Sequence, residues 1–176
     1  HLSGGTTELL HVTPDGVNVH AEKLGGTSDI SAGQLIDRTG VLLGIPFPAG
    51  KGLDALAAAS ESKERFPVRL NGLTFSLSGM ENKSRAMAEP GREGADIARF
   101  VLNTVSDVVR RATLEAQKAY PGLPVLCSGG VASNRILRDV MTRACQTAFA
   151  EPRYSTDNAM GVAILAPRLR NGGDVP

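Results

Sequence analysis

Two glycine-rich stretches of the chain carry residue types that suit the binding of an anion. The first is Ser3-Gly4-Gly5-Thr6-Thr7, directly after Leu2, and the second is Ser128-Gly129-Gly130. Because glycine has no Cβ, it permits tight turns and lets backbone amides approach a phosphate closely. One Gly-Gly turn is weak support, since most such turns only connect two strands. Two of them on one α/β scaffold predict a nucleotide held between them.

Local patterns predict the strands that position these turns. Residues 2–13 are expected to form a strand interrupted at Gly4-Gly5, and Pro14-Asp15-Gly16 then closes an antiparallel hairpin. Asn71-Gly72 is a favoured hairpin dipeptide between two further short strands, which cover residues 66–70 and 73–77. A buried strand at residues 124–127 leads into the second glycine-rich stretch.

Apolar residues at helical spacing predict helices between the strands. The expected helices cover residues 32–43, 53–60, 92–120, 134–147 and 159–166. Residues 78–89 are largely polar, and we expect them to form a mobile loop that contacts a partner. The order of the elements predicts a mixed α/β domain with an antiparallel part.

Composition narrows the class of protein. A chain of 176 residues fits one domain, and a formal net charge of +1 does not by itself indicate a nucleic-acid or membrane partner. Aromatic residues make up 4% and tryptophan is absent, which argues against a base-stacking platform. No apolar run could span a bilayer, which favours a cytoplasmic protein. Cys127 and Cys145 stand alone in apolar contexts and are expected to be reduced core thiols.

Six stretches, in one order along the chain, resemble motifs of the TsaD family, the tRNA threonylcarbamoyltransferases once described as O-sialoglycoprotein endopeptidases. The matching stretches are Leu2–Thr7 (family SGGHT), Ala32–Arg38 (AGEAFDK), Leu43–Gly50 (LGLPYPGG), Phe75–Gly79 (FSFSG), Gly129–Asn134 (GGVAAN) and Ser155–Ala159 (CTDNA). Each motif is weak alone, but six in the same order are specific.

The resemblance implies an actin-like ATPase (ribonuclease H-like) domain with a mixed sheet, which forms one half of a two-domain clamp. Residues 1–176 would be the single C-terminal domain. Since the sequence opens without methionine and inside an expected strand, we expect the N-terminal partner domain to lie outside it.

The resemblance also implies a bound adenine nucleotide, either ATP, AMP or an acyl-adenylate. The turn of Ser3, Gly4, Gly5, Thr6 and Thr7 would contact its phosphate or acyl part. No catalytic side chain is assigned.

The other implied contacts come from later motifs of the chain. Asp37 would hold the ribose diol, and Asn134 would hydrogen-bond the base or sugar. Gly50 and the Gly129-Gly130 pair would let the backbone approach the nucleoside. Asp157 would be the single metal ligand from this half, and a carboxylate suits iron, zinc or magnesium.

In the family, the N6 amine of a tRNA adenosine attacks a threonylcarbamoyl-adenylate and AMP is released. The implied partners are therefore tRNA, the protein's own N-terminal domain and TsaB-like or TsaE-like proteins of the same pathway. A homodimer is a further expectation, and no membrane partner is expected.

Several positions depart from the family motifs. Thr6 stands where the family has histidine, Ile30 where it has a second aspartate, Gln34 where it has glutamate and Glu81 where it has lysine. An acidic residue in place of a basic one disfavours a path for tRNA phosphates. A second function therefore stays open: a non-catalytic nucleotide-binding or dimerising paralogue, like the TsaB proteins. The chain shows no pattern that supports a glycoprotease.

Each candidate residue also has a purely structural interpretation. Asp157 and Asn134 could cap helices, and Asp37 could pair with Arg38 or Lys51 on the surface. Gly4-Gly5 could be only a hairpin turn. The histidines of the first hairpin could bind a metal, although surface histidines on strands are far commoner.

Overall fold

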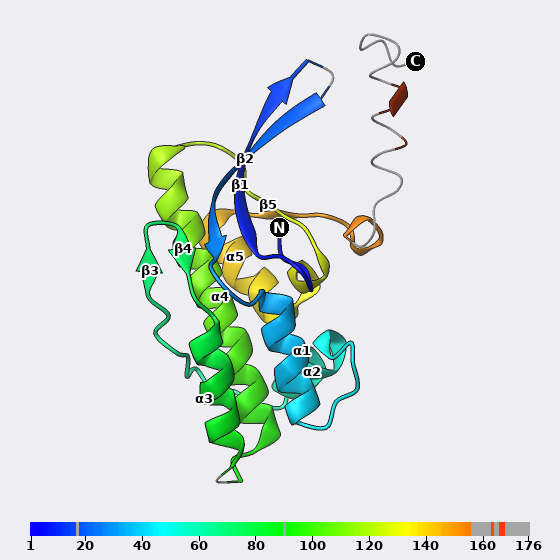
Figure 1. Ribbon diagram of the computed structural model, residues 1–176, viewed down its shortest axis with the longest axis vertical. Coiled ribbons are helices and arrows are strands. Elements are labelled where there is room, and N and C mark those ends of the chain that lie inside the picture. The colour runs from blue at the N-terminus through cyan, green and yellow to red at the C-terminus, as the bar shows by residue number, and fades with distance from the viewer. Residues whose placement is uncertain (17, 90, 156–162, 164–165, 168–176) are drawn as a thin grey trace.

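The computed structural model describes residues 1–16, 18–89, 91–155, 163 and 166–167 (Figure 1). The strands in these ranges are β1 (Glu8–Asp15), β2 (Asn18–Thr27), β3 (Leu70–Asn71), β4 (Thr74–Phe75), β5 (Leu126–Cys127) and β6 (Ala148–Phe149). The helices are α1 (Ala32–Leu42), α2 (Gly50–Ala57), α3 (Ser78–Ala88), α4 (Gly94–Ala119) and α5 (Arg135–Cys145), with 3-10 turns η1 (Gly130–Ser133) and η2 (Pro152–Tyr154).

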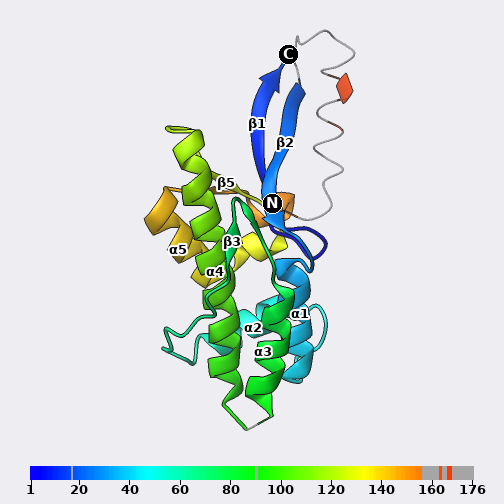
Figure 2. The ribbon, with the colours of Figure 1, turned by 60° about the vertical axis from the view of Figure 1, so that its left-hand side comes forward.

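The described strands form a mixed sheet and a smaller parallel pair. In the larger sheet the order is β1-β2-β4-β3, and β2 runs antiparallel to β1 but parallel to β4. Strands β5 and β6 pair in parallel as a second sheet. The β1–β2 hairpin projects from the body of the molecule (Figures 1 and 2). The predicted α/β class, with its antiparallel part, is therefore confirmed, whereas β6 is an element that the sequence analysis does not predict.

Helix α4 is the centre of the hydrophobic core. Its 26 residues bury apolar side chains along the whole length, including Ile97, Val101, Val105, Val108 and Ala112. Burying one such side chain contributes roughly 1.5–3 kcal/mol, so this helix holds the other elements together. Helix α5 packs on one side of α4, and α3 with α1 lies on another, as Figure 2 shows.

Most of the predicted elements are present with shifted ends. Helix α2 begins at Gly50 and not at residue 53, and the strands on either side of Asn71-Gly72 are shorter than expected. The helix expected at residues 159–166 falls almost wholly outside the described residues. Cys127 and Cys145 are buried free thiols, as predicted, and burial raises the pKa of both. In the described chain, no helix has the length and hydropathy needed to cross a bilayer.

The prediction of a loop at residues 78–89 is wrong, because this segment forms helix α3. Met80, Ser84 and Met87 lie on its buried face, four and three residues apart. The pattern is hard to recognise because only two of these side chains are apolar and the rest of the helix is polar.

Asp29, in the loop between β2 and α1, stabilises the start of α3. Its Oδ1 accepts the Leu77 N–H at 2.8 Å, and Oδ2 accepts hydrogen bonds from Ser76 Oγ and the Ser78 N–H. Partial burial acts to raise the pKa of Asp29, but the hydrogen bonds from Ser76, Leu77 and Ser78 outweigh it and hold the pKa well below its usual range. The carboxylate of Asp29, from a loop far away in the sequence, thus takes the place of the N-cap side chain that α3 lacks.

We expect Asp29→Asn to remove part of the acid sensitivity of the domain. A depressed pKa means that Asp29 stabilises the fold above its unfolded pKa of about 3.9, and that this contribution is lost as pH falls toward the folded pKa. The difference in urea midpoint between wild type and Asp29→Asn should be greatest at neutral pH and should shrink under acid conditions. Asp15→Asn, at the exposed hairpin turn, is the control. A pH-independent difference would contradict this assignment.

Candidate nucleotide-binding site

The first glycine turn (residues 3–7) is closed by its own side chains. The Thr6 N–H donates to Ser3 Oγ at 3.0 Å, and the Ser3 N–H donates to the Thr6 carbonyl at 2.9 Å. Leu2 and Thr7 pair across its base in an antiparallel bridge. The turn is therefore a small preformed loop.

This turn is fixed against the N-terminus of helix α1. Thr7 is buried, and its hydroxyl accepts the Ala32 N–H at 2.8 Å, while Ser31 Oγ donates to the Gly4 carbonyl at 2.7 Å. A Cβ on Gly33 would lie 2.5 Å from Gly4 Cα, so only glycine permits this approach. The Thr7 side chain thus fixes the turn to α1, and its contact with a nucleotide stays a prediction.

The middle of the turn faces open space. Gly4 and Gly5 are exposed, and a Cβ on either would meet no atom within 4 Å. In the part of the chain that the structure describes, their two N–H groups donate no hydrogen bond. Adjacent unpaired amides of this kind can bind an anion.

The second glycine turn (residues 128–130) lies beside the first. The Leu2 N–H donates to the Ser128 carbonyl at 2.8 Å, and the Val131 N–H donates to the Leu2 carbonyl at 3.0 Å. Gly129 has φ of 95°, and a Cβ there would lie 2.2 Å from the Leu2 oxygen. The chain therefore brings together the two glycine turns that the sequence analysis singled out.

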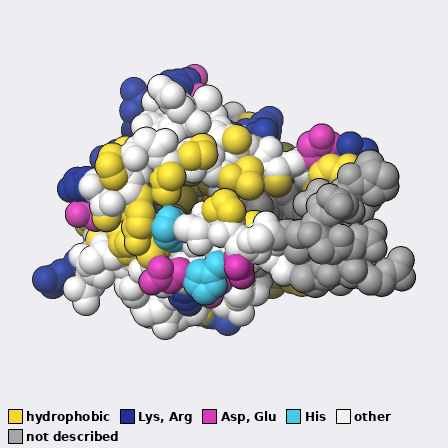
Figure 3. All heavy atoms as spheres, turned by 90° about the horizontal axis from the view of Figure 1, so that it is seen from above, with side chains coloured by type: hydrophobic (Ala, Val, Ile, Leu, Met, Phe, Trp, Pro, Cys, Tyr) yellow, Lys and Arg dark blue, Asp and Glu magenta, His cyan; other side chains and the backbone are white. Residues whose placement is uncertain are grey.

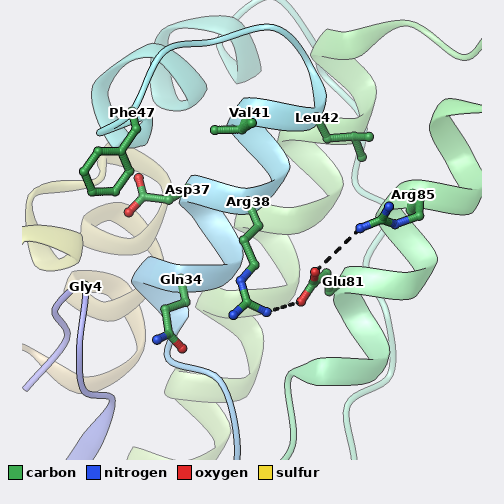
Figure 4. Close-up of a pocket in the computed structure, with 9 residues that line it drawn as sticks. All are labelled: Gly4, Gln34, Asp37, Arg38, Val41, Leu42, Phe47, Glu81 and Arg85. Atoms are coloured by element: carbon green, nitrogen blue, oxygen red, sulfur yellow. Dashed lines mark hydrogen bonds and ion pairs between the residues drawn. The ribbon is translucent and has the colours of Figure 1, made fainter.

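An open cavity of about 630 Å³ begins next to the first glycine turn. We call it the Asp37 hollow. Figure 4 shows that most of its lining comes from α1, with two side chains of α3 on the far side. The lining residues are Gly4, Gln34, Asp37, Arg38, Val41, Leu42, Phe47, Glu81 and Arg85. The hollow thus combines an apolar wall with charged groups of both signs.

Asp37 lies inside this hollow as an acceptor. Its Oδ1 accepts the Ala49 N–H at 2.8 Å, which ties the start of α2 to α1. The surface pairing of Asp37 with Arg38, one of the open alternatives, is not seen, because Arg38 contacts Glu81 at 2.6 Å. Within the described residues Oδ2 of Asp37 accepts no hydrogen bond, so a diol could use it.

The remaining glycines predicted for the site have free space beside them. A Cβ on Gly50, in the first turn of α2, or on Gly130, at the start of η1, would meet no atom within 4 Å. Gly50 follows Ala49, whose amide is bound by Asp37. Both glycines leave room for a ligand to approach the backbone.

Asn134 caps helix α5, which confirms the structural interpretation of this residue. Its Oδ1 accepts the Leu137 N–H at 3.0 Å, and its Nδ2 donates to Asp54 Oδ1 at 2.8 Å. Asn134 is 8% exposed. Asp54 is a partner that sequence reasoning missed, because it lies on α2, far away in the chain. The contact of Asn134 with a nucleotide stays a prediction.

The predicted metal ligand, Asp157, lies outside the described residues. Among the residues that are described, no three His, Cys, Asp or Glu side chains come together as a metal site. His11 stacks on Tyr120, with ring centroids 4.3 Å apart, and His20 pairs across the strands with Thr13. Figure 3, which looks onto the hairpin end, shows histidines among apolar and acidic side chains. The described residues alone therefore do not fit a metal ion.

Two of the departures from the family motifs have local partners. Gln34 completes a capping box with Ser31, since its Oε1 accepts the Ser31 N–H at 3.1 Å. Glu81 pairs with Arg38 at 2.6 Å and lies 3.8 Å from Arg85. The acidic residue therefore neutralises cations at the mouth of the Asp37 hollow.

A glycine turn with open amides, beside a second glycine turn and a hollow that contains a carboxylate, has the chemistry that suits an anionic ligand. A family model described as TsaD, tRNA N6-adenosine threonylcarbamoyltransferase, matches residues 1–164. The chain belongs to the TsaD family.

Two curated relatives support this membership. They are proteins named tRNA N6-adenosine threonylcarbamoyltransferase from Lacticaseibacillus casei (strain BL23) and Lacticaseibacillus paracasei (strain ATCC 334). Each is 32% identical to this chain over 182 aligned residues, which cover 98% of the chain and 50% of the relative. The chain thus spans about half the length of the curated relatives it matches.

Proposed function

We propose that this domain forms one wall of an adenylate site in a protein that transfers a threonylcarbamoyl group from the adenylate to a tRNA adenosine. The observation that supports this most strongly is the pair of unused, exposed amides at Gly4 and Gly5 beside the Asp37 hollow. In this proposal the fold is actin-like (ribonuclease H-like), and the second wall of the clamp comes from an N-terminal domain.

Each part of the site has one task in this proposal. The amides of Gly4 and Gly5 bind the phosphate, and Oδ2 of Asp37 accepts a ribose hydroxyl. Gly50 and Gly130 let the nucleoside lie close to the backbone. Fixing the adenylate in this way places its carbamoyl carbon for attack by the N6 amine of adenosine, with AMP as the leaving group.

The proposal includes partners beyond this chain. Transfer needs tRNA as acceptor, and TsaB-like or TsaE-like proteins and a second copy are the further partners expected. A divalent metal held with Asp157 would neutralise charge on the phosphate when bound.

A second function is favoured by one contact. Glu81 places a carboxylate at the mouth of the hollow, paired with Arg38, where the family motif has lysine. A negative group at this position lowers the affinity for nucleic-acid phosphates. The alternative is a nucleotide-binding or dimerising paralogue without transfer activity.

The two functions are separated by measuring nucleotide binding and transfer on the same sample. The full-length protein is titrated with AMP and ATP by calorimetry and assayed for threonylcarbamoyl transfer to unmodified tRNA. We expect the transferase and a nucleotide-binding paralogue both to bind nucleotide, and only the transferase to modify tRNA. Absence of any adenylate binding would contradict the transferase and the nucleotide-binding paralogue, and would leave only the dimerising paralogue. The chain of residues 1–176 alone should bind nucleotide weakly and transfer nothing, because it supplies only one wall.

A further inference from the structure

A cleft on a second face of the domain gathers cationic side chains. It has a volume of about 350 Å³ and lies between α4 and the extended segment 60–66, which runs beside α4 on the side away from α3 (Figure 2). We call it the basic cleft. The residues that define it are Lys63, Arg65, Arg99, Asn103, Asp107 and Arg110. None of these residues lines the Asp37 hollow.

The segment that forms one wall of the basic cleft is held rigidly without regular secondary structure. Asn103 Nδ2 donates to the carbonyls of Ser62 and Glu64, at 2.9 and 3.1 Å. The Phe66 N–H donates to Thr104 Oγ1 at 2.8 Å. Because side chains of α4 fix the backbone on both sides of Lys63, its position in the cleft is preorganised.

The charges in the cleft do not balance. In the described residues its lining holds four cationic side chains and the single carboxylate of Asp107. That carboxylate is already saturated, since it accepts from Arg110 at 3.0 Å and from Arg111 at 2.8 Å, with Arg65 3.6 Å away. Lys63 has no ion-pair partner within the described ranges. An excess of positive charge is therefore left for a ligand.

Arg99, which lines the cleft, has a guanidinium whose hydrogen bonds are incomplete within the described residues. Its Nη1 donates to the Ser60 carbonyl at 3.2 Å, whereas its Nε is buried and unpaired in the described chain. A buried donor without an acceptor is unfavourable, and the guanidinium can form charge-assisted hydrogen bonds with a ligand oxygen.

We infer that the basic cleft binds the phosphodiester backbone of RNA, as a second contact surface that shares no lining residue with the Asp37 hollow. Arginine, lysine and asparagine are the side chains that contact nucleic-acid phosphates. The lining includes one apolar side chain, Val140, and no aromatic ring, whereas protein interfaces usually have apolar or aromatic anchors at their centre. The inference rests on the proposed function only in that tRNA is the acceptor there.

The test is the affinity of the full-length protein for unmodified tRNA as a function of salt, measured by fluorescence anisotropy. Lys63→Gln with Arg65→Gln removes two exposed charges and leaves the hydrogen bonds of Asn103 intact. We expect affinity to fall about ten-fold or more at low salt, and the slope of log affinity against log salt to decrease by about 1–2. Lys23→Gln with Lys118→Gln, which removes two exposed lysine charges outside the cleft, should have little effect.

Three further measurements test whether a loss of tRNA affinity comes from the basic cleft itself. Lys63→Gln alone breaks no observed contact, so this single variant replaces the double variant in the test if the double variant has a lower Tm than wild type. Equal losses of tRNA affinity in the cleft variant and in the control variant would overturn the inference. It would also be overturned if poly-glutamate displaced tRNA as well as poly(U) does at equal charge. AMP affinity should be unchanged in the cleft variant, so a failure of the adenylate proposal would be seen separately.

Discussion

Replacing Gly129 with alanine is expected to destabilise the domain by about 3 kcal/mol or more and to separate the two glycine turns. Its φ of 95° and ψ of 161° belong to a region that is essentially restricted to glycine. The new Cβ would also lie 2.2 Å from the Leu2 carbonyl oxygen, and backbone on both sides must move. Calorimetric Tm and urea unfolding measure the loss, which should lower Tm by roughly 6–12 °C.

The neighbouring glycine offers a matched control. Gly130→Ala adds the same methyl group where no atom lies within 4 Å, and its φ is not positive. We expect stability close to that of wild type. If the nucleoside approaches this backbone as proposed, Gly130→Ala should nevertheless weaken AMP binding. Equal Tm losses in the two variants would refute the role assigned to Gly129.

Replacing Asp37 with alanine is expected to weaken AMP binding by about 10–100-fold, which corresponds to roughly 1.5–3 kcal/mol for a hydrogen bond to a charged group. The carboxylate lies in the hollow beside Gly4, and its Oδ2 is available to a ribose hydroxyl. Calorimetric titration with AMP, and with 2′,3′-dideoxy-AMP as a ligand without the diol, measures the effect. The dideoxy ligand should bind wild type and Asp37→Ala equally.

Loss of the Ala49 hydrogen bond could also lower affinity indirectly, so a second substitution is needed. Asp37→Asn retains an oxygen for the Ala49 N–H but lacks the negative charge. We expect it to keep the wild-type Tm and to bind AMP with intermediate affinity. Undiminished AMP affinity in both Asp37 variants would remove Asp37 from the proposed site.

The parts of the fold that the sequence predicts are those with local signals. The hairpin turn after Pro14 and the long apolar stripe of α4 depend on residues close together in the chain, and both are present. The sequence does not predict helix α3, because many of the contacts that stabilise this helix come from residues far away in the chain. Its first amides are bound by Asp29, and its buried face meets α1 and α4.

The candidate site likewise has parts that local motifs predict and parts that they do not. The adjoining glycine turns and the position of Asp37 follow from motifs that can be read in order. The sequence alone could not show that the Thr7 hydroxyl is bound by the Ala32 amide, or that the Asn134 amide is bound by Asp54. These contacts join segments far apart in the chain, and hydrogen bonding between them has no signature in local spacing.

The hydrogen bonds of Leu2 have a consequence for the order in which the protein folds. Leu2 is hydrogen-bonded to Ser128 and Val131, which lie 126 and 129 residues further along the chain, so closing this contact carries a large loop-entropy cost. The two glycine turns should therefore meet late, after α4 and the hairpin have formed. A ligand that requires both turns would bind only the completed fold. At a concentration one hundred times its Kd, it would then stabilise the entire domain by about 2.7 kcal/mol.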